Sequence, residues 1–141
     1  MKAILFALSF MLAAPAAQAD FFYECFCKTC GGSERFEPDV LADGRVVAIY
    51  ANDDYEVADT ARYKLDLTYN PSVRRGYYRY LPTSTGGNYM SHPVAIVPIN
   101  FHKGVLEGTV YLQHRRENGS IDERTYKCKR RKDRNVDAID Q

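Results

Sequence analysis

The chain has 141 residues, of which 45% are hydrophobic and 26% charged, and its formal net charge is +1 at pH 7. This length fits one domain with a modest core. The near-neutral charge provides no overall attraction for nucleic acid. Eleven tyrosines and seven phenylalanines, without tryptophan, are typical of β-strands that have one solvated face.

Residues 1–19 have the pattern of a secretory signal peptide. Lys2 is the charged end, an apolar run follows, and Ala17-Gln18-Ala19 is a small-x-small cleavage site. The apolar run is too short for a membrane span. The leader takes one of the 19 Lys and Arg residues and none of the 18 Asp and Glu residues, so the mature chain is nearly neutral. We therefore expect a secreted monomer with no membrane attachment, comprising residues 20–128 as one domain and 129–141 as a charged tail.

The first half of the mature chain predicts strands around one helix. Residues 20–27 are aromatic and predict a strand, and Cys30-Gly31-Gly32-Ser33 predicts a turn. Pro38-Asp39 predicts the start of a helix, and the apolar positions up to Tyr50 would form one side of it. Gly44 argues against it, and residues 45–51 alternatively form a buried strand. Residues 62–69 alternate between apolar and polar side chains and predict a half-buried strand.

The second half predicts strands only. They cover residues 76–81, 94–97, 105–113 and 124–128, with a polar loop over 82–93. Glu117-Asn118-Gly119-Ser120 is a hairpin turn. Together the predicted elements indicate an α+β domain with an antiparallel sheet and one helix.

Four cysteines follow the leader: Cys25, Cys27, Cys30 and Cys128. An even number in an exported chain predicts disulfides. A zinc site needs a second cysteine pair or suitably spaced histidines, and a redox C-x-x-C needs a helix start, so both are disfavoured, and we expect no metal and no cofactor. Two pairings remain open. One is Cys25–Cys128 with Cys27–Cys30, and the other is Cys27–Cys128 with Cys25–Cys30.

Residues 77–128 are similar in order and spacing to secreted fungal ribonucleases of the guanyl-specific and ribotoxin kind. The shared features are the aromatic strand Tyr77–Leu81 ending at a proline, the apolar strand 94–97, the Gly-containing strand ending at His114, and Cys128. The layout also resembles the ribonuclease-like effectors of powdery mildews, because Tyr23-Glu24-Cys25 matches their aromatic-x-Cys motif. The resemblance implies a disulfide-stapled RNase-like fold.

The resemblance also implies that the catalytic groups are lost. These ribonucleases use a glutamate base, a histidine acid and an arginine, and only the histidine has a counterpart, His114. Arg79 stands at the glutamate position, and no arginine lies in 94–97. Without its base the enzyme loses general base catalysis, which contributes about 10²–10⁴-fold. We therefore expect a catalytically inactive protein.

The leading hypothesis is a pathogen effector that acts in virulence by binding a host protein, such as an immune receptor, or host RNA, after secretion or delivery into host cells. Cations and aromatic side chains could hold phosphates and bases. The candidate binding residues are Tyr23, Arg79, His114, Arg115, Arg116, Lys129, Arg130 and Arg131.

Two alternatives come from other classes. One is an active secreted ribonuclease or ribotoxin that depends on His114. The other is a bacterial periplasmic inhibitor, because Thr85-Gly86-Gly87-Asn88-Tyr89 is similar to the Ser-Gly-x-x-Tyr loop of small β-barrel lysozyme inhibitors, which also carry an end-to-end disulfide. The first residue of this segment departs from that motif.

Overall fold

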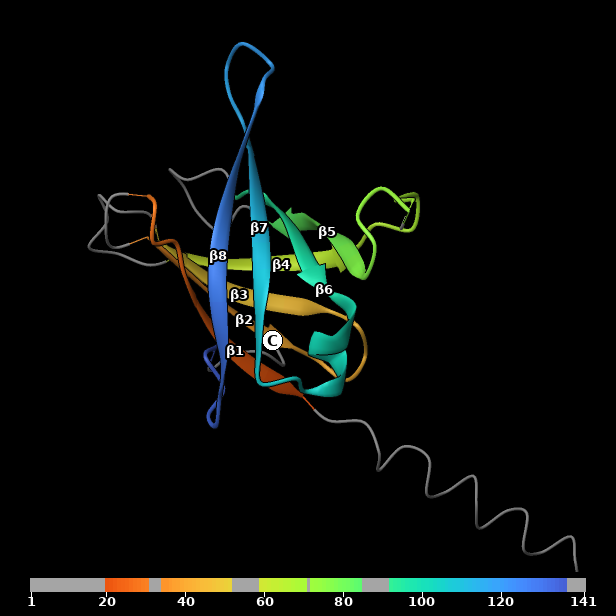
Figure 1. Ribbon diagram of the computed structural model, residues 1–141, viewed down its shortest axis with the longest axis vertical. Helices are drawn as coiled ribbons and strands as arrows, with labels where there is room; N and C mark the ends of the chain where they lie inside the picture. The colour runs from red at the N-terminus through yellow and green to blue at the C-terminus, as the bar shows by residue number, and fades with distance from the viewer. Residues whose placement is uncertain (1–19, 31–33, 52–58, 71, 85–91, 137–141) are drawn as a thin grey trace, which may run out of the picture.

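The protein is a closed antiparallel β-barrel of eight strands in the computed structural model (Figure 1). The structure describes residues 20–30, 34–51, 59–70, 72–84 and 92–136. The predicted signal peptide lies outside these residues, as does the segment 85–89. The strands and the single described helix, of the 3-10 type, are β1 (Phe21–Phe26), β2 (Arg35–Val40), β3 (Val46–Ala51), β4 (Asp59–Leu65), β5 (Tyr77–Ser84), β6 (Val94–Pro98), η2 (Ile99–Lys103), β7 (Glu107–Arg115) and β8 (Ile121–Arg131).

Each strand pairs with its neighbours in sequence, and β8 returns to pair with β1, which closes the sheet. In that last pair Cys25 lies opposite Cys128, and a disulfide joins them. The second disulfide joins Cys27 to Cys30 in the turn after β1. Disulfide bonding is thereby confirmed, with the first of the two pairings left open by the sequence.

The predicted α+β class is wrong, because the described chain contains no α-helix and the fold is all-β. The expected helix from Pro38 to Tyr50 is instead the hairpin of β2 and β3. Gly44 makes the turn with a φ of 95°, a conformation that glycine adopts without strain. Nearly all side chains of both strands are buried, and β3 is an apolar run that does not alternate. Periodicity cannot separate such a strand from a buried helix.

The barrel interior is filled by side chains. Inward-facing tyrosine, phenylalanine and aliphatic residues from all eight strands form one cluster with both sulfur atoms of Cys25–Cys128. An eight-stranded barrel is just wide enough for side chains to meet across it, so a packed interior is the expected result. Within the described residues the inward-facing side chains of the barrel therefore form its core.

The two ends of the barrel differ. At one end η2 places Phe101 inside, and its ring stacks on Tyr23 with 3.8 Å between centroids. The Tyr23 hydroxyl donates a hydrogen bond to the carbonyl oxygen of Val105 (2.6 Å). We call this the η2 end. The other end carries the Cys27–Cys30 turn and the β7–β8 hairpin, which projects beyond the barrel in Figure 1. We call it the disulfide end.

Part of the predicted tail belongs to the barrel. Residues 129–131 are the last three of β8. Further on, the Asp39 carboxylate accepts hydrogen bonds from the backbone N–H groups of Asn135 (3.0 Å) and Val136 (2.9 Å). The Val136 side chain packs on Leu41 and Val47, outside the main core. This contact covers the outer face of β2 and β3 and explains why both faces of these strands are buried.

We expect Cys25–Cys128 to carry most of the disulfide stabilisation. Its ends are 103 residues apart, whereas those of Cys27–Cys30 are 3 apart. In the chain-entropy model the long loop contributes about 4–5 kcal/mol and the short one about 2 kcal/mol. Urea unfolding of Cys25→Ala/Cys128→Ala should show the larger loss of unfolding free energy, with Cys27→Ala/Cys30→Ala as the matched control. Equal losses would contradict this assignment.

Candidate functional site

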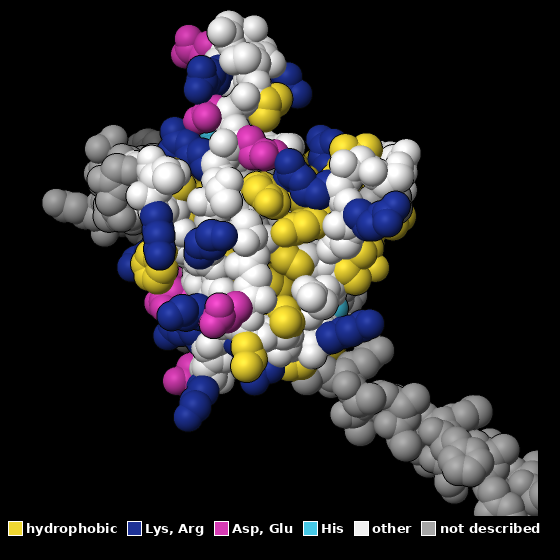
Figure 2. All heavy atoms as spheres, viewed as in Figure 1, with side chains coloured by type: hydrophobic (Ala, Val, Ile, Leu, Met, Phe, Trp, Pro, Cys, Tyr) yellow, Lys and Arg dark blue, Asp and Glu magenta, His cyan; other side chains and the backbone are white. Residues whose placement is uncertain are grey.

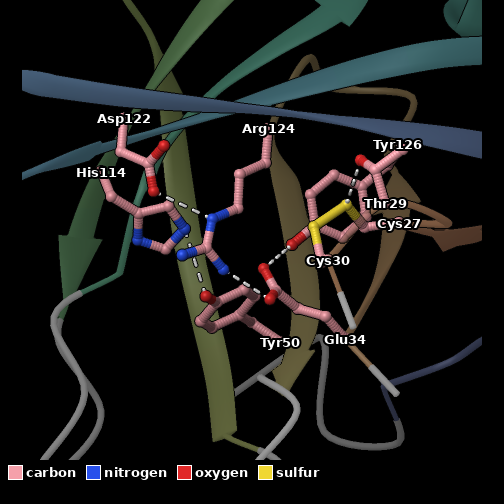
Figure 3. Close-up of a disulfide and its surroundings, with 9 residues drawn as sticks. All are labelled: Cys27, Thr29, Cys30, Glu34, Tyr50, His114, Asp122, Arg124 and Tyr126. Atoms are coloured by element: carbon pink, nitrogen blue, oxygen red, sulfur yellow. Dashed lines mark hydrogen bonds and ion pairs between the residues drawn. A yellow bond between two sulfur atoms is a disulfide. The ribbon is translucent and has the colours of Figure 1, made fainter. Parts of the chain in front are cut away.

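The most distinctive feature of the disulfide end is a carboxylate that is completely buried. Glu34, which precedes β2, is 0% exposed. One of its oxygens accepts a hydrogen bond from Arg124 Nη1 at 2.5 Å, and the other accepts one from the Tyr126 hydroxyl (Figure 3). A buried carboxylate needs such partners, because an unpaired buried charge is very costly.

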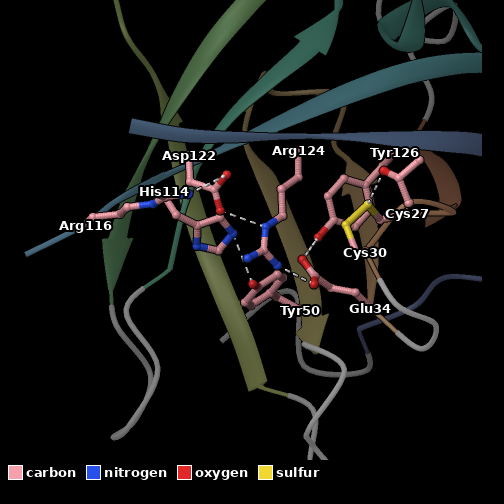
Figure 4. A network of polar contacts seen from close by, with 10 residues as sticks. Cys27, Cys30, Glu34, Tyr50, His114, Arg116, Asp122, Arg124 and Tyr126 are labelled. Carbon is pink, nitrogen blue, oxygen red and sulfur yellow. Dashed lines mark hydrogen bonds and ion pairs between the residues drawn. A yellow bond between two sulfur atoms is a disulfide. The ribbon is translucent and has the colours of Figure 1, made fainter. Parts of the chain in front are cut away.

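Arg124 connects this carboxylate to a second one. Its Nε lies 3.0 Å from Asp122 Oδ2, and Asp122 also pairs with Arg116 at 3.4 Å (Figure 4). Asp122 and Arg124 stand at alternate positions of β8 and so share its inner face. Arg124 therefore holds two carboxylates that lie at different depths, since the side chain of Asp122 is 24% exposed and that of Glu34 is fully buried.

His114 lies beside this network at the end of β7. A hydrogen bond of 3.2 Å joins its Nε2 to the Tyr50 hydroxyl. Burial lowers the pKa of His114, and the nearby charge of Arg124 lowers it further. The imidazole is thereby held neutral at pH 7. A neutral histidine bound to a tyrosine and facing an arginine is a packing element of the barrel mouth.

The charges of the network support one another. Burial raises the pKa of Tyr126, and its hydrogen bond to Glu34 raises it further, so the phenol stays protonated and donates. Burial tends to raise the pKa of Asp122, but the hydrogen bond and charge of Arg124, together with Arg116, bring it below the usual value. The result is a closed set of donors and acceptors, which we call the mouth network: Glu34, Tyr50, His114, Asp122, Arg124 and Tyr126.

A depression borders the mouth network on the outside. It is lined by Cys30 and Thr29 from the turn after β1 and by residues 122–125 of β8, with Arg116 across from them. Its walls are almost entirely polar. This is a surface on which a macromolecular partner could find hydrogen bonds.

The sequence-predicted binding residues do not come together in one surface. Tyr23 is in the core, and Arg130 is exposed at the η2 end, where it contacts the Gly104 carbonyl and the Phe21 ring. Lys129 is exposed on the outer wall, opposite Glu24 and Glu107. The basic run of β8 is split because successive side chains of a strand point to opposite faces.

The remaining predicted binding residues are divided between the two ends of the barrel. Arg131 pairs with Glu37 at 3.6 Å, and Arg79 pairs with Asp66 at 3.6 Å, near the η2 end. Arg115 and Arg116 are exposed beside the β7–β8 turn at the disulfide end, where His114 also lies. Arg79 and His114, which the ribonuclease resemblance aligns with the catalytic base and acid, are therefore at opposite ends of the barrel.

Sequence reasoning missed the centre of the mouth network. Glu34 stands between a glycine turn and a strand and has no periodic signal of its own. Its partners, Arg124 and Tyr126, are about ninety residues away and sit in a strand that alternates in the ordinary way. The only available signal was the pairing of Cys25 with Cys128, which brings the two segments side by side.

The outer wall has two unlike faces (Figure 2). Lys and Arg side chains stand over β8, whereas hydrophobic side chains gather beside β7 toward β5 and β6. There the rings of Tyr77 and Tyr111 are 5.5 Å apart, and the Arg74 guanidinium covers Tyr111 at 4.0 Å from its centre. Arg74 is in turn held by both oxygens of Glu123. The Tyr111 ring is therefore covered by Arg74, a cation of the protein itself.

Two further findings concern metals and membranes. Across the described ranges, no group of three or more His, Cys, Asp or Glu side chains is arranged to hold a metal ion. No helix in the same part of the chain is long and apolar enough to cross a membrane.

Comparison with known proteins gives no relative. No protein-family model matches the chain, and no curated protein or solved structure matches it.

We expect Arg124→Met to destabilise the fold by roughly 2–3 kcal/mol, because it leaves the buried Glu34 carboxylate without its cation. Urea unfolding measures this loss. Arg115→Met, at an exposed position of the neighbouring strand, is the matched control and should cost less than about 0.5 kcal/mol. Similar effects of the two changes would show that the mouth network does not stabilise the barrel.

Stability should fall as the pH drops from 7 toward 5. Burial lowers the pKa of both His102 and His114 in the folded state. A lowered histidine pKa contributes stability above the unfolded-state pKa of about 6.5, and this is lost as the pH falls through the folded-state value. Urea midpoints at pH 7.5 and pH 5 should differ less in His102→Gln/His114→Gln than in the unchanged protein. An undiminished difference would assign the effect to other groups.

Proposed function

We propose that the protein is exported and acts as an inhibitor of a lysozyme. The observation that carries this proposal is the closed eight-stranded barrel whose first and last strands are joined by Cys25–Cys128. The lysozyme inhibitors to which Thr85–Tyr89 is similar are small β-barrels with an end-to-end disulfide. The effector hypothesis rested on an α+β fold, and the all-β barrel gives it no support.

The position of the candidate segment supports this proposal. Residues 85–91 join β5 to β6, and in an antiparallel barrel the end of β5 and the start of β6 belong to the end that carries Cys27–Cys30. The polar depression beside Cys30 and the β7–β8 hairpin belong to the same end. A partner bound at the end of the barrel where β5 ends and β6 begins would therefore be on the same side as these polar groups.

The chemistry of a lysozyme suits such a segment. Glycosidases of this kind cleave with two carboxyl groups in a cleft. Thr85, Asn88 and Tyr89 supply hydroxyl and amide donors that carboxylates accept, and Gly86-Gly87 lets the backbone come close. The side chains packed in the barrel interior support action at the surface, where the polar depression lies. The proposal thus keeps the expectation that the protein works by binding.

The test is a turbidity assay of bacterial cell-wall lysis with a panel of lysozymes. The unchanged protein should slow clearing by at least one of them, and Tyr89→Ala should weaken inhibition about tenfold or more if the ring is a central contact. Tyr69→Ala is the matched control, since Tyr69 follows β4 at the η2 end. Both variants should keep the circular dichroism of the folded barrel.

Absence of inhibition by the folded protein against the whole panel would overturn the proposal. Equal inhibition by Tyr89→Ala and the unchanged protein would show that the candidate segment is not the contact.

A further inference from the structure

The two disulfides occupy different environments. Cys25 and Cys128 are 0% and 2% exposed and lie inside the main core. Cys27 is also buried, but Cys30 is only half-buried and lines the depression at the disulfide end. Cys128 also borders a depression, beside Glu24 and Lys129, but it is only 2% exposed. Cys30 is therefore the most accessible of the four cysteines.

The two bridges also differ in what they hold together. Cys25–Cys128 crosslinks β1 to β8 at the seam that closes the barrel. Cys27–Cys30 closes a turn that follows β1 and links no two strands. That turn keeps other contacts, because the Cys30 N–H donates to the Cys27 carbonyl and the Cys27 N–H donates to the Glu34 carbonyl. The barrel can therefore remain closed when the second bridge opens.

The surroundings of the second bridge suit a thiol. The Thr29 hydroxyl lies 3.8 Å from Cys27 Sγ, within reach of a weak hydrogen bond to sulfur (Figure 3). The depression that holds Cys30 also holds the cations Arg116 and Arg124, together with the anions Asp122 and Glu123. Both arginines pair with Asp122, and Arg124 also pairs with Glu34, so their charges are already matched by carboxylates. The contact that favours a thiol at Cys27 is therefore the Thr29 hydroxyl.

We propose that Cys27–Cys30 is a thiol–disulfide exchange site, reduced at Cys30 by a low-molecular-weight thiol while Cys25–Cys128 and the barrel stay intact. The thiolate of the donor attacks Cys30 Sγ and forms a mixed disulfide. The Cys27–Cys30 bond breaks, and its electron pair and the donor's proton go to Cys27 Sγ, beside Thr29. A second donor thiol then attacks the donor sulfur of the mixed disulfide. Overall, two donor thiols are oxidised to one disulfide and the bridge is reduced to two thiols.

The first test is limited reduction of the folded protein with glutathione, followed by alkylation and peptide mapping. We expect label at Cys27 and Cys30 and none at Cys25 or Cys128, with the circular dichroism of the barrel retained. Cys27→Ser/Cys30→Ser should take up no label under the same conditions. Simultaneous reduction of both bridges, or reduction only when the barrel unfolds, would overturn the proposal.

The second test asks which sulfur is attacked. Cys27→Ser leaves the half-buried Cys30, and Cys30→Ser leaves the buried Cys27, while Cys25–Cys128 holds the barrel in both variants. With oxidised glutathione, we expect a mixed disulfide to form at least about tenfold faster in Cys27→Ser, because exchange depends on access to the sulfur. Equal rates, or a faster reaction of Cys30→Ser, would contradict attack at Cys30.

Discussion

The pairing of β1 with β8 is the constraint on which the rest of the structure depends. Seven of the eight strand pairs join neighbours in sequence, whereas this one joins segments about a hundred residues apart. Closing a loop of that length is unfavourable for the chain. The Cys25–Cys128 bridge lowers that cost at the register position where the two cysteines face each other. A closed barrel also has no open edge at which another chain could add a strand.

The mouth network follows from the same closure. Glu34 precedes β2, whereas Arg124 and Tyr126 belong to β8, and only the β1–β8 pair brings them into contact. Arg124 of the network and the neighbouring Arg116 together match the charges of Glu34 and Asp122. The neutral His114 and the protonated Tyr126 are consequences of burial beside those charges. The network closes one barrel end with polar groups, and η2 closes the other with Phe101. The barrel is therefore closed by polar side chains at the disulfide end and by an aromatic side chain at the η2 end.

Much of the fold could be predicted from local pattern. The strands expected over 62–69, 76–81, 94–97, 105–113 and 124–128 correspond to β4 through β8 with shifted boundaries, and Asn118-Gly119 does make the last turn. The pattern failed where burial is two-sided. Val136 packs on the outside of β3, whose sequence is apolar throughout and so lacks the alternation that marks a strand. β2 does alternate, but its Pro38-Asp39 also resembles a helix start. A contact made by the end of the chain could not be read from residues 38–50.

The candidate site was less predictable, because its members are defined by closure and not by spacing. The basic run of β8 is contiguous in sequence, yet Arg130 reaches the Gly104 carbonyl at the η2 end, whereas Lys129 stands on the opposite face of the strand, on the outer wall. Arg116, by contrast, shares a depression with Cys30, eighty-six residues earlier in the chain. The interpretation of the C-x-x-C motif Cys27–Cys30 also depends on contacts that closure of the barrel creates. Its local sequence lacks the helix that a redox site ordinarily uses, but closure of the barrel places Cys30 at a depression beside β8. Because the segment that joins β5 to β6 starts and ends at this same end of the barrel, a binding partner and a thiol would approach the protein from the same side.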